Sequence, residues 1–122
     1  MGKIKLRMTA KAPVDACYRA GMSVSDSPEM LPNIRELRVV DKSDDGSRVK
    51  SRWTAAAKLL TVERSLSWMQ EDTWDEENRT CRFCLCPGEK GNMKKYDGTW
   101  AFRPHPDGTE TLKEEDGKEK HP

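Results

Sequence analysis

Long apolar runs and aliphatic side chains are scarce in this chain of 122 residues. Leu, Val, Ile and Phe together number 18, and no segment resembles the roughly 20 consecutive apolar residues of a membrane-spanning helix. The first ten residues alternate charged and apolar side chains, whereas a signal peptide needs an unbroken apolar stretch. The sequence therefore predicts one hydrophilic unit, cytoplasmic and not inserted in membranes.

An excess of charge of one sign is also missing, because 22 Lys and Arg residues oppose 21 Asp and Glu residues in an interspersed pattern. A protein that binds a nucleic-acid backbone usually carries a basic face, so we expect no nucleic-acid partner. Neither a glycine-rich phosphate loop nor a Ser-His-Asp arrangement is evident, and we expect no cofactor.

Disulfide bonds are not expected, because Cys17, Cys81, Cys84 and Cys86 occur without a secretion signal. Cys81 and Cys84 have the spacing of half a zinc site. On a strand, however, Cys81 would face away from Cys84 and Cys86, and no second pair of ligands follows. Structural or incidental thiols are favoured over a metal or redox site, and we expect no metal.

Two periodicities indicate the secondary structure. Residues 3–10 alternate with period two, which predicts a half-buried strand with Ile4, Leu6 and Met8 on one face. Pro13 then opens a helix that runs to about residue 24, and a short second helix is expected at 27–32. Six strands follow, expected at residues 34–42, 48–57, 59–72, 79–86, 94–103 and 109–113.

This order predicts an α+β domain around one strongly curved antiparallel sheet, with two short helices after the first strand. The domain is expected to span residues 1–113. Residues 114–122 are rich in charge and contain no apolar side chain, so they predict a disordered, solvated tail.

Aromatic and polar side chains of equal parity would meet on the concave side of such a sheet. Rings of this kind suit a flat, partly oxygenated ligand, although they could equally fill a small core. The residues expected to bind the ligand are Trp53, Leu66, Trp68, Gln70, Tyr96, Trp100 and Phe102.

Three side chains are candidates for proton transfer on the same concave side, namely Tyr96, Asp72 and Arg64. Each could polarise a ketone or move a proton during an aldol ring closure. The competing interpretation of each is a surface residue or a hydrogen-bonded structural residue.

Four segments follow one another along the chain: Ala12-Pro13-Val14-Asp15, residues 27–34, Gly98-Thr99-Trp100-Ala101-Phe102 and Asp107-Gly108-Thr109-Glu110. In this order they resemble the polyketide cyclase/dehydrase branch of the START-like superfamily, also called Bet v 1-like, SRPBCC or helix-grip. The last two look most like aromatase/cyclases of bacterial aromatic polyketide synthesis. The resemblance implies a helix-grip fold with a ligand cavity between the sheet and a long C-terminal helix.

The chain departs from that family pattern in two places. It ends in a charged tail where the family has further strands and the long helix, so we expect an open groove or a helix supplied by a partner chain. Family aromatases also place an arginine on the pocket side of the strand expected at 59–72, where this chain has Asp72, preceded by Gln70.

Three functions remain open at this point. The leading hypothesis is a domain that binds a hydrophobic or aromatic small molecule and closes and dehydrates a ring in a poly-ketone. The second is a non-catalytic carrier or sensor of a lipid or quinone. The third is a groove that accepts a partner helix, with a homodimer completing the open side.

Overall fold

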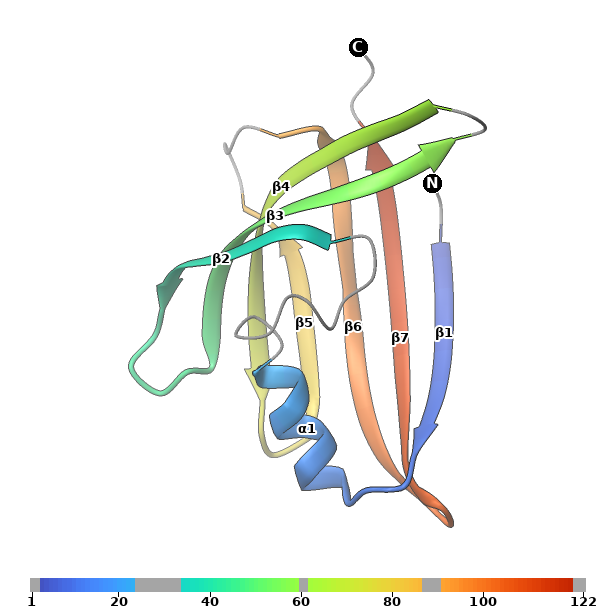
Figure 1. Ribbon diagram of the computed structural model, residues 1–122. Helices are drawn as coiled ribbons and strands as arrows, with labels where there is room; N and C mark the ends of the chain where they lie inside the picture. The colour runs from blue at the N-terminus through green and yellow to red at the C-terminus, as the bar shows by residue number, and fades with distance from the viewer. Residues whose placement is uncertain (1–2, 24–33, 60–61, 87–90, 120–122) are drawn as a thin grey trace.

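A single curved sheet and one helix make up the described part of the computed structural model, which comprises residues 3–23, 34–59, 62–86 and 91–119 (Figure 1). The sheet is antiparallel, with the strand order β1-β7-β6-β5-β4-β3-β2. The elements are β1 (Lys3–Ala10), α1 (Val14–Met22), β2 (Ile34–Lys42), β3 (Arg48–Leu59), β4 (Val62–Asp75), β5 (Thr80–Leu85), β6 (Met93–His105) and β7 (Gly108–Glu119).

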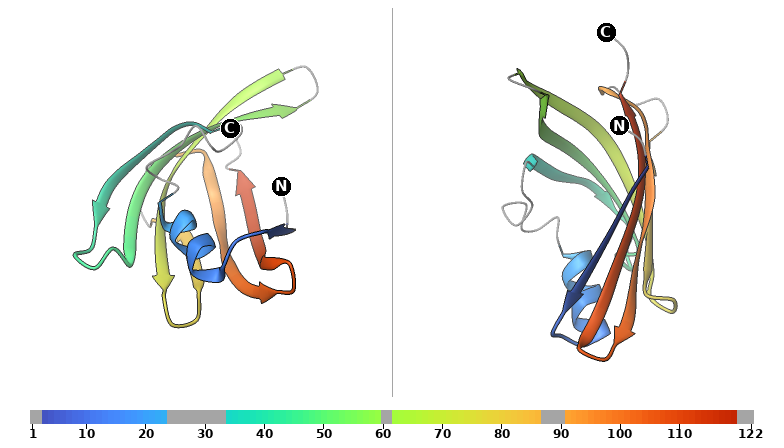
Figure 2. Two further views of the ribbon diagram at one scale, coloured as in Figure 1. Left: turned by 60° about the horizontal axis from the view of Figure 1, so that its bottom comes forward. Right: turned by 90° about the vertical axis from the view of Figure 1, so that its right-hand side faces the viewer.

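The sheet bends around α1, which lies within its concave side (Figure 2). This arrangement confirms the expected α+β class, the curved antiparallel sheet and the six consecutive strands after the first helix. One short helix, α1, is present in the described residues. The second helix expected at 27–32 lies outside them.

The last strand is longer than the sequence predicted. β7 continues to Glu119, whereas a solvated tail was expected from residue 114. The charged side chains there find partners of opposite charge on neighbouring strands, such as Lys95 with Asp116 at 2.8 Å and Lys5 with Glu114 at 3.9 Å. Such cross-strand pairs make a charged sequence compatible with a strand. The expected tail therefore differs from the structure over residues 114–119.

Helix α1 begins after Pro13, whose fixed φ suits a helix start, and Asp15 lies in the first turn, where a negative charge favours the helix dipole. Its buried residue Tyr18 makes edge-to-face contacts with Trp74 and Phe102, at ring-centroid distances of 5.5 and 5.9 Å. Val49 and Cys81 complete this helix-side cluster. The cluster forms the part of the core that lies between α1 and the sheet.

A second cluster lies on the same face of the sheet, away from α1. Its buried members are Leu66, Trp68 and Met93, and Trp53 and Tyr96 pack against them. The register accounts for this grouping, because Trp53 lies opposite Trp68 in the pairing of β3 with β4. Side chains directly opposite each other on antiparallel strands point to the same face.

Candidate functional site

Four rings of the concave face form a continuous surface, the aromatic wall: Trp53, Trp68, Tyr96 and Phe83. The two indoles are stacked with their centroids 6.0 Å apart and their planes 6° from parallel. The Tyr96 ring lies 5.2 Å from both Trp68 and Phe83, measured between centroids. β3, β4, β5 and β6 therefore each contribute one ring to this cluster, in which Trp68 and Phe83 are buried while Trp53 and Tyr96 are partly exposed and can contact a flat apolar molecule.

Gly98 makes room for one ring of the aromatic wall. A Cβ at this position would lie 2.5 Å from Cζ of Phe83 and 2.1 Å from the backbone oxygen of Glu114. Both distances are far below van der Waals contact. The absence of a side chain at Gly98 thus allows Phe83 to lie across β6 and reach Tyr96.

The indole N–H groups of Trp53 and Trp68 already donate hydrogen bonds within the protein. Trp53 Nε1 donates a hydrogen bond to Ser51 Oγ at 2.9 Å, and Trp68 Nε1 donates to Gln70 Oε1 at 2.9 Å. A bound molecule would consequently meet the faces of these rings. Its polar groups would have to be recognised by other side chains.

Those polar side chains lie beside the aromatic wall and form the polar floor: Gln70, Asp72, Lys113 and Glu115. Glu115 Oε2 accepts the hydroxyl of Tyr96 at 2.6 Å and lies 3.1 Å from Lys113 Nζ. The ammonium group of Lys113 lies 4.7 Å from the ring centroid of Trp100, within the range of a cation–π contact. Burial and the hydrogen bond to Glu115 raise the pKa of Tyr96, so its hydroxyl stays protonated.

Asp72 has the properties of a proton-transfer group. Desolvation raises the pKa of its carboxyl from 3.8 to about 6, against the opposing effects of the hydrogen bond from Gln70 and the charge of Lys113. A carboxyl with a pKa near neutrality can accept and return a proton at physiological pH. Such perturbed groups are common at functional sites.

The residues predicted to bind a ligand all share the concave face by register, but they fall into two groups. Trp53, Leu66, Trp68, Gln70 and Tyr96 lie together at the aromatic wall and the polar floor. Phe102 and Trp100 belong to the helix-side cluster, where Phe102 is buried against Tyr18.

The three predicted proton-transfer residues do not all lie at one place on the sheet. Tyr96 and Asp72 are close enough to influence each other electrostatically, since the Asp72 charge contributes to the raised pKa of Tyr96. Arg64 is exposed and lies on the part of β4 that pairs with Ala57, beyond the segment of β4 bonded to β5. The structure therefore brings two of the three candidates together.

Sequence reasoning missed Phe83, Lys113 and Glu115. Phe83 shares the parity of Cys81 in β5, and this alternation was the available signal. Lys113 and Glu115 stand opposite Trp100 and Gly98 in the pairing of β6 with β7. Their polar, charged sequence has no apolar alternation, so no local signal placed them on the concave face.

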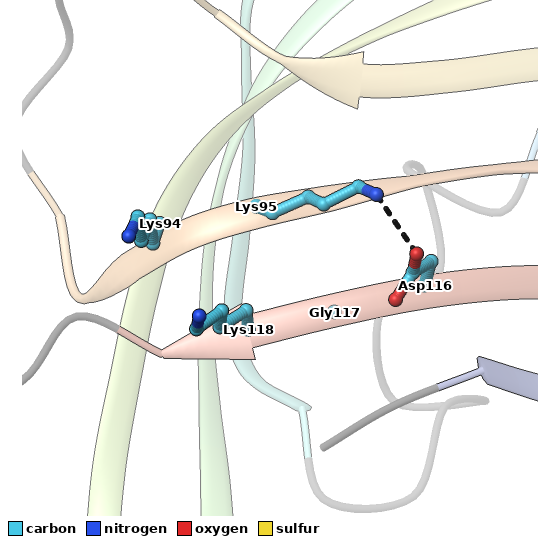
Figure 3. Close-up of a pocket in the computed structure, with 5 residues that line it drawn as sticks. All are labelled: Lys94, Lys95, Asp116, Gly117 and Lys118. Carbon is cyan, nitrogen blue, oxygen red and sulfur yellow. Dashed lines mark hydrogen bonds and ion pairs between the residues drawn. The ribbon is translucent and has the colours of Figure 1, made fainter.

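Two shallow hollows lie outside the aromatic wall. The larger, of about 590 Å³, lies at the ends of β6 and β7 and is lined by Lys94, Lys95, Asp116, Gly117 and Lys118 (Figure 3). The smaller, of about 360 Å³, lies between β1 and β7. Ligand sites for flat apolar molecules are lined mostly by apolar side chains with a few polar groups, and neither hollow is lined by a ring of the aromatic wall.

The described part of the chain contains no helix long and apolar enough to cross a membrane.

The cysteines occupy unlike surroundings. Cys81 is buried, and desolvation raises the pKa of its thiol, whereas Cys84 is exposed on β5.

The fold is shared by several solved structures. The protein TTHA0849 of Thermus thermophilus matches with a TM-score of 0.84 and 28% identity, over 98% of this chain and 76% of that one. The Zhui aromatase/cyclase of Streptomyces sp. R1128 gives a TM-score of 0.79 and 12% identity, over 98% of this chain and 69% of that one. A START superfamily protein of Mycobacterium smegmatis gives 0.77 and 14%, over 100% and 80% of the two chains.

Comparison with curated protein sequences finds no match. The family model described as polyketide cyclase/dehydrase and lipid transport matches residues 10–116, which is most of the chain. The match includes α1, every strand of the aromatic wall and the charged residues of the polar floor. On this evidence the chain belongs to the polyketide cyclase/dehydrase and lipid transport family.

Proposed function

We propose that this protein binds a hydrophobic or aromatic small molecule against the aromatic wall and closes and dehydrates a ring in a poly-ketone held there. The observation that carries the proposal is the position of Asp72, a carboxyl with a pKa of about 6, on the same face as the four rings. The family description and the likeness to an aromatase/cyclase support the same reaction class.

The proposed reaction depends mainly on orientation. A flexible poly-ketone laid against flat rings has fewer conformations, so a carbon next to one ketone meets the carbon of a distant carbonyl more often. Asp72 would take a proton from the attacking carbon, and the new C–C bond would convert the carbonyl to an alkoxide. Asp72 would then return the proton to that oxygen, and loss of one water would complete the ring.

Lys113 has a supporting role in this scheme. Its ammonium group lies on the polar floor and can donate a hydrogen bond to the oxygen on which negative charge develops. Tyr96 is held by its hydrogen bond to Glu115 and would position the Lys113–Glu115 pair. Because Tyr96 is not a free donor, we assign the proton transfer to Asp72.

A naphthyl triketone, in which carbonyl and methylene groups alternate, tests the proposal. Ring closure and loss of one water convert it to a naphthyl resorcinol, which chromatography separates from the substrate and from a pyranone formed through oxygen. We expect the protein to accelerate resorcinol formation and Asp72→Asn to lower the rate at least tenfold. Glu114→Gln removes an exposed carboxylate from the opposite face and should keep the rate. Equal rates with and without protein would reject the proposed enzyme.

The alternative is a non-catalytic carrier or sensor of a lipid or quinone. The internal pairing of Lys113 and Tyr96 with Glu115 favours it, because both groups are occupied before a substrate arrives. Binding of naphthalene compounds, measured by quenching of tryptophan fluorescence, together with no turnover of the triketone would select this alternative.

A partner helix or second copy of the chain is the remaining candidate for the concave side. Ile4, Leu6 and Met8 of β1 are 40%, 48% and 52% exposed on that side, so the described residues leave this apolar strip partly uncovered. Sedimentation of the purified protein across a wide concentration range tests whether the protein forms a homodimer. A strict monomer would exclude it.

A further inference from the structure

The hydrogen bonds on the concave face of β4 run in one direction. An indole nitrogen can only donate, so Trp68 Nε1 fixes the side-chain oxygen of Gln70 as its acceptor. The amide nitrogen of Gln70 then points the other way and donates to Asp72 Oδ1 at 2.7 Å. Residues 68, 70 and 72 thus form a ladder that ends on the carboxylate of Asp72.

The second oxygen of that carboxylate is available. No described residue donates a hydrogen bond to Asp72 Oδ2. Among the described residues, no buried side-chain oxygen or nitrogen lacks a partner. Oδ2 is therefore not completely buried although the carboxyl group is largely desolvated, and it is an acceptor that no described side chain uses.

The charges around this acceptor do not cancel. Glu115 and Lys113 lie 3.1 Å apart and neutralise each other, and both side chains are largely buried. Asp72 feels the charge of Lys113 but forms no ion pair with it among the described contacts. The polar floor therefore carries one excess negative charge whenever Asp72 is ionised, in surroundings where charges are weakly screened.

From this geometry we infer that the site selects neutral ligands with a hydroxyl donor, such as phenols and enols, and rejects carboxylates. A ligand hydroxyl would donate to Asp72 Oδ2 while the ring system lies on the aromatic wall. Among the described residues of the polar floor, the paired Lys113 is the one cationic donor for a ligand carboxylate, which would also meet the like charges of Asp72 and Glu115. The inference rests on the proposed function, because it names the ligand class of the same site.

Three naphthalene compounds, compared at pH 8, separate the effect of a donated hydrogen bond on affinity from the effect of ligand charge. 2-Naphthol donates a hydrogen bond, 2-methoxynaphthalene cannot, and 2-naphthoate is an anion. Dissociation constants come from quenching of tryptophan fluorescence. The wild-type protein should bind 2-naphthol at least tenfold more tightly than either of the others. In Asp72→Asn the preference over 2-methoxynaphthalene should fall below threefold, and 2-naphthoate should bind more tightly than it does to wild type.

Two further variants complete the experiment. Glu115→Gln keeps an acceptor for Tyr96 and Lys113 but removes a charge, so it should strengthen binding of 2-naphthoate without abolishing the preference for 2-naphthol. Glu114→Gln removes the neighbouring charge from the opposite face and should change neither ratio. Circular dichroism establishes that each variant is folded.

The possible results distinguish this inference from the proposed function. If 2-naphthoate binds wild type as tightly as 2-naphthol, or if the preference for 2-naphthol survives in Asp72→Asn, the inferred ligand class is wrong although an aromatic site exists. If none of the three compounds binds wild type, both the inference and the proposed function are wrong.

Discussion

Asp72 links the stability of the protein to pH. Its carboxyl has a pKa of about 6 in the folded protein and 3.8 as the unperturbed value, with desolvation as the main cause. The folded state consequently holds this proton more tightly than the unfolded chain. The resulting stabilisation is fully present below pH 3.8, decreases as the pH rises through about 6, and is lost above that.

Asp72→Asn should therefore stabilise the protein at pH 8, because Asn keeps an acceptor for Gln70 without a charge. A difference of about two pKa units corresponds to about 3 kcal/mol, so a gain of about 1–3 kcal/mol is expected for a partly buried group. At pH 4 the gain should largely vanish. Urea unfolding at both pH values measures it, and an equal gain at both would contradict the assigned pKa.

The elements of this fold were predictable where side chains alternate in polarity. The set Trp53, Leu66, Trp68, Gln70 and Tyr96 could be assigned to one face because its parity is unambiguous on each strand. The contact of Phe83 with Gly98 could not be predicted from the sequence, because it depends on the register between β5 and β6.

The length of β7 was underestimated for a related reason. Its residues beyond Lys113 gain their partners from β1 and β6, which are distant in sequence. A local pattern of charges therefore indicated a tail. Glu115 was missed because it fell in the predicted tail, whereas Lys113 ended the predicted strand but was not assigned to the concave face.

Gly98→Ala tests the contact between β5 and β6. The added Cβ would overlap the ring of Phe83 and the backbone of β7, and overpacking of this kind typically costs about 1–3 kcal/mol. Denaturant unfolding should show that loss, and quenching by 2-naphthol should weaken because Phe83 is displaced. Thr99→Ala, at the exposed neighbouring position, serves as the control. Unchanged stability in Gly98→Ala would show that this close approach is wrong.

Arg79 joins the β4–β5 turn to α1. Its Nε donates to Asp15 Oδ1 at 2.7 Å, its guanidinium carbon lies 5.4 Å from the ring centroid of Tyr18, and its backbone has a φ of 51°. Glycine adopts this conformation freely, whereas other residues are strained there.

Two substitutions at this position separate the side chain from the backbone. Arg79→Ala loses the contacts to α1 and keeps the strain, so we expect a loss of about 1–2 kcal/mol, the sum typical of an exposed ion pair and a cation–π contact. Arg79→Gly loses the same contacts but relieves the strain, and should be about 1 kcal/mol more stable than Arg79→Ala. Amide exchange in α1 should accelerate in both variants. If the alanine variant is the more stable one, the positive φ is not the native conformation.

At the scale of the whole molecule, the chain has little aliphatic material, and the described residues leave part of the apolar concave face exposed. The strip of Ile4, Leu6 and Met8 remains about half exposed. Two β1 edges do not pair readily, because antiparallel arrangements that overlap these apolar residues on one face place Lys5 opposite Arg7, or place Lys5 or Arg7 opposite itself. A ligand or partner would therefore cover the face and not extend the sheet at this edge.

Occupation of the concave side should raise the melting temperature markedly. A ligand at a hundredfold excess over its dissociation constant adds about 2.7 kcal/mol, which corresponds to about 10 °C for a chain of this size. We expect that shift with 2-naphthol at saturation. A homodimer would instead raise the melting temperature with protein concentration. Melting that responds to neither variable would contradict the open-face account.

The claim that the aromatic wall is the binding surface can be tested directly through the four indole N–H signals in a two-dimensional nitrogen–proton NMR spectrum. During titration with 2-naphthol, the signals of Trp53 and Trp68 should shift together along one binding curve, while that of Trp74, buried against Tyr18, should stay unchanged. Shifts confined to Trp74, or no shift of Trp53 and Trp68 at saturation, would contradict the account.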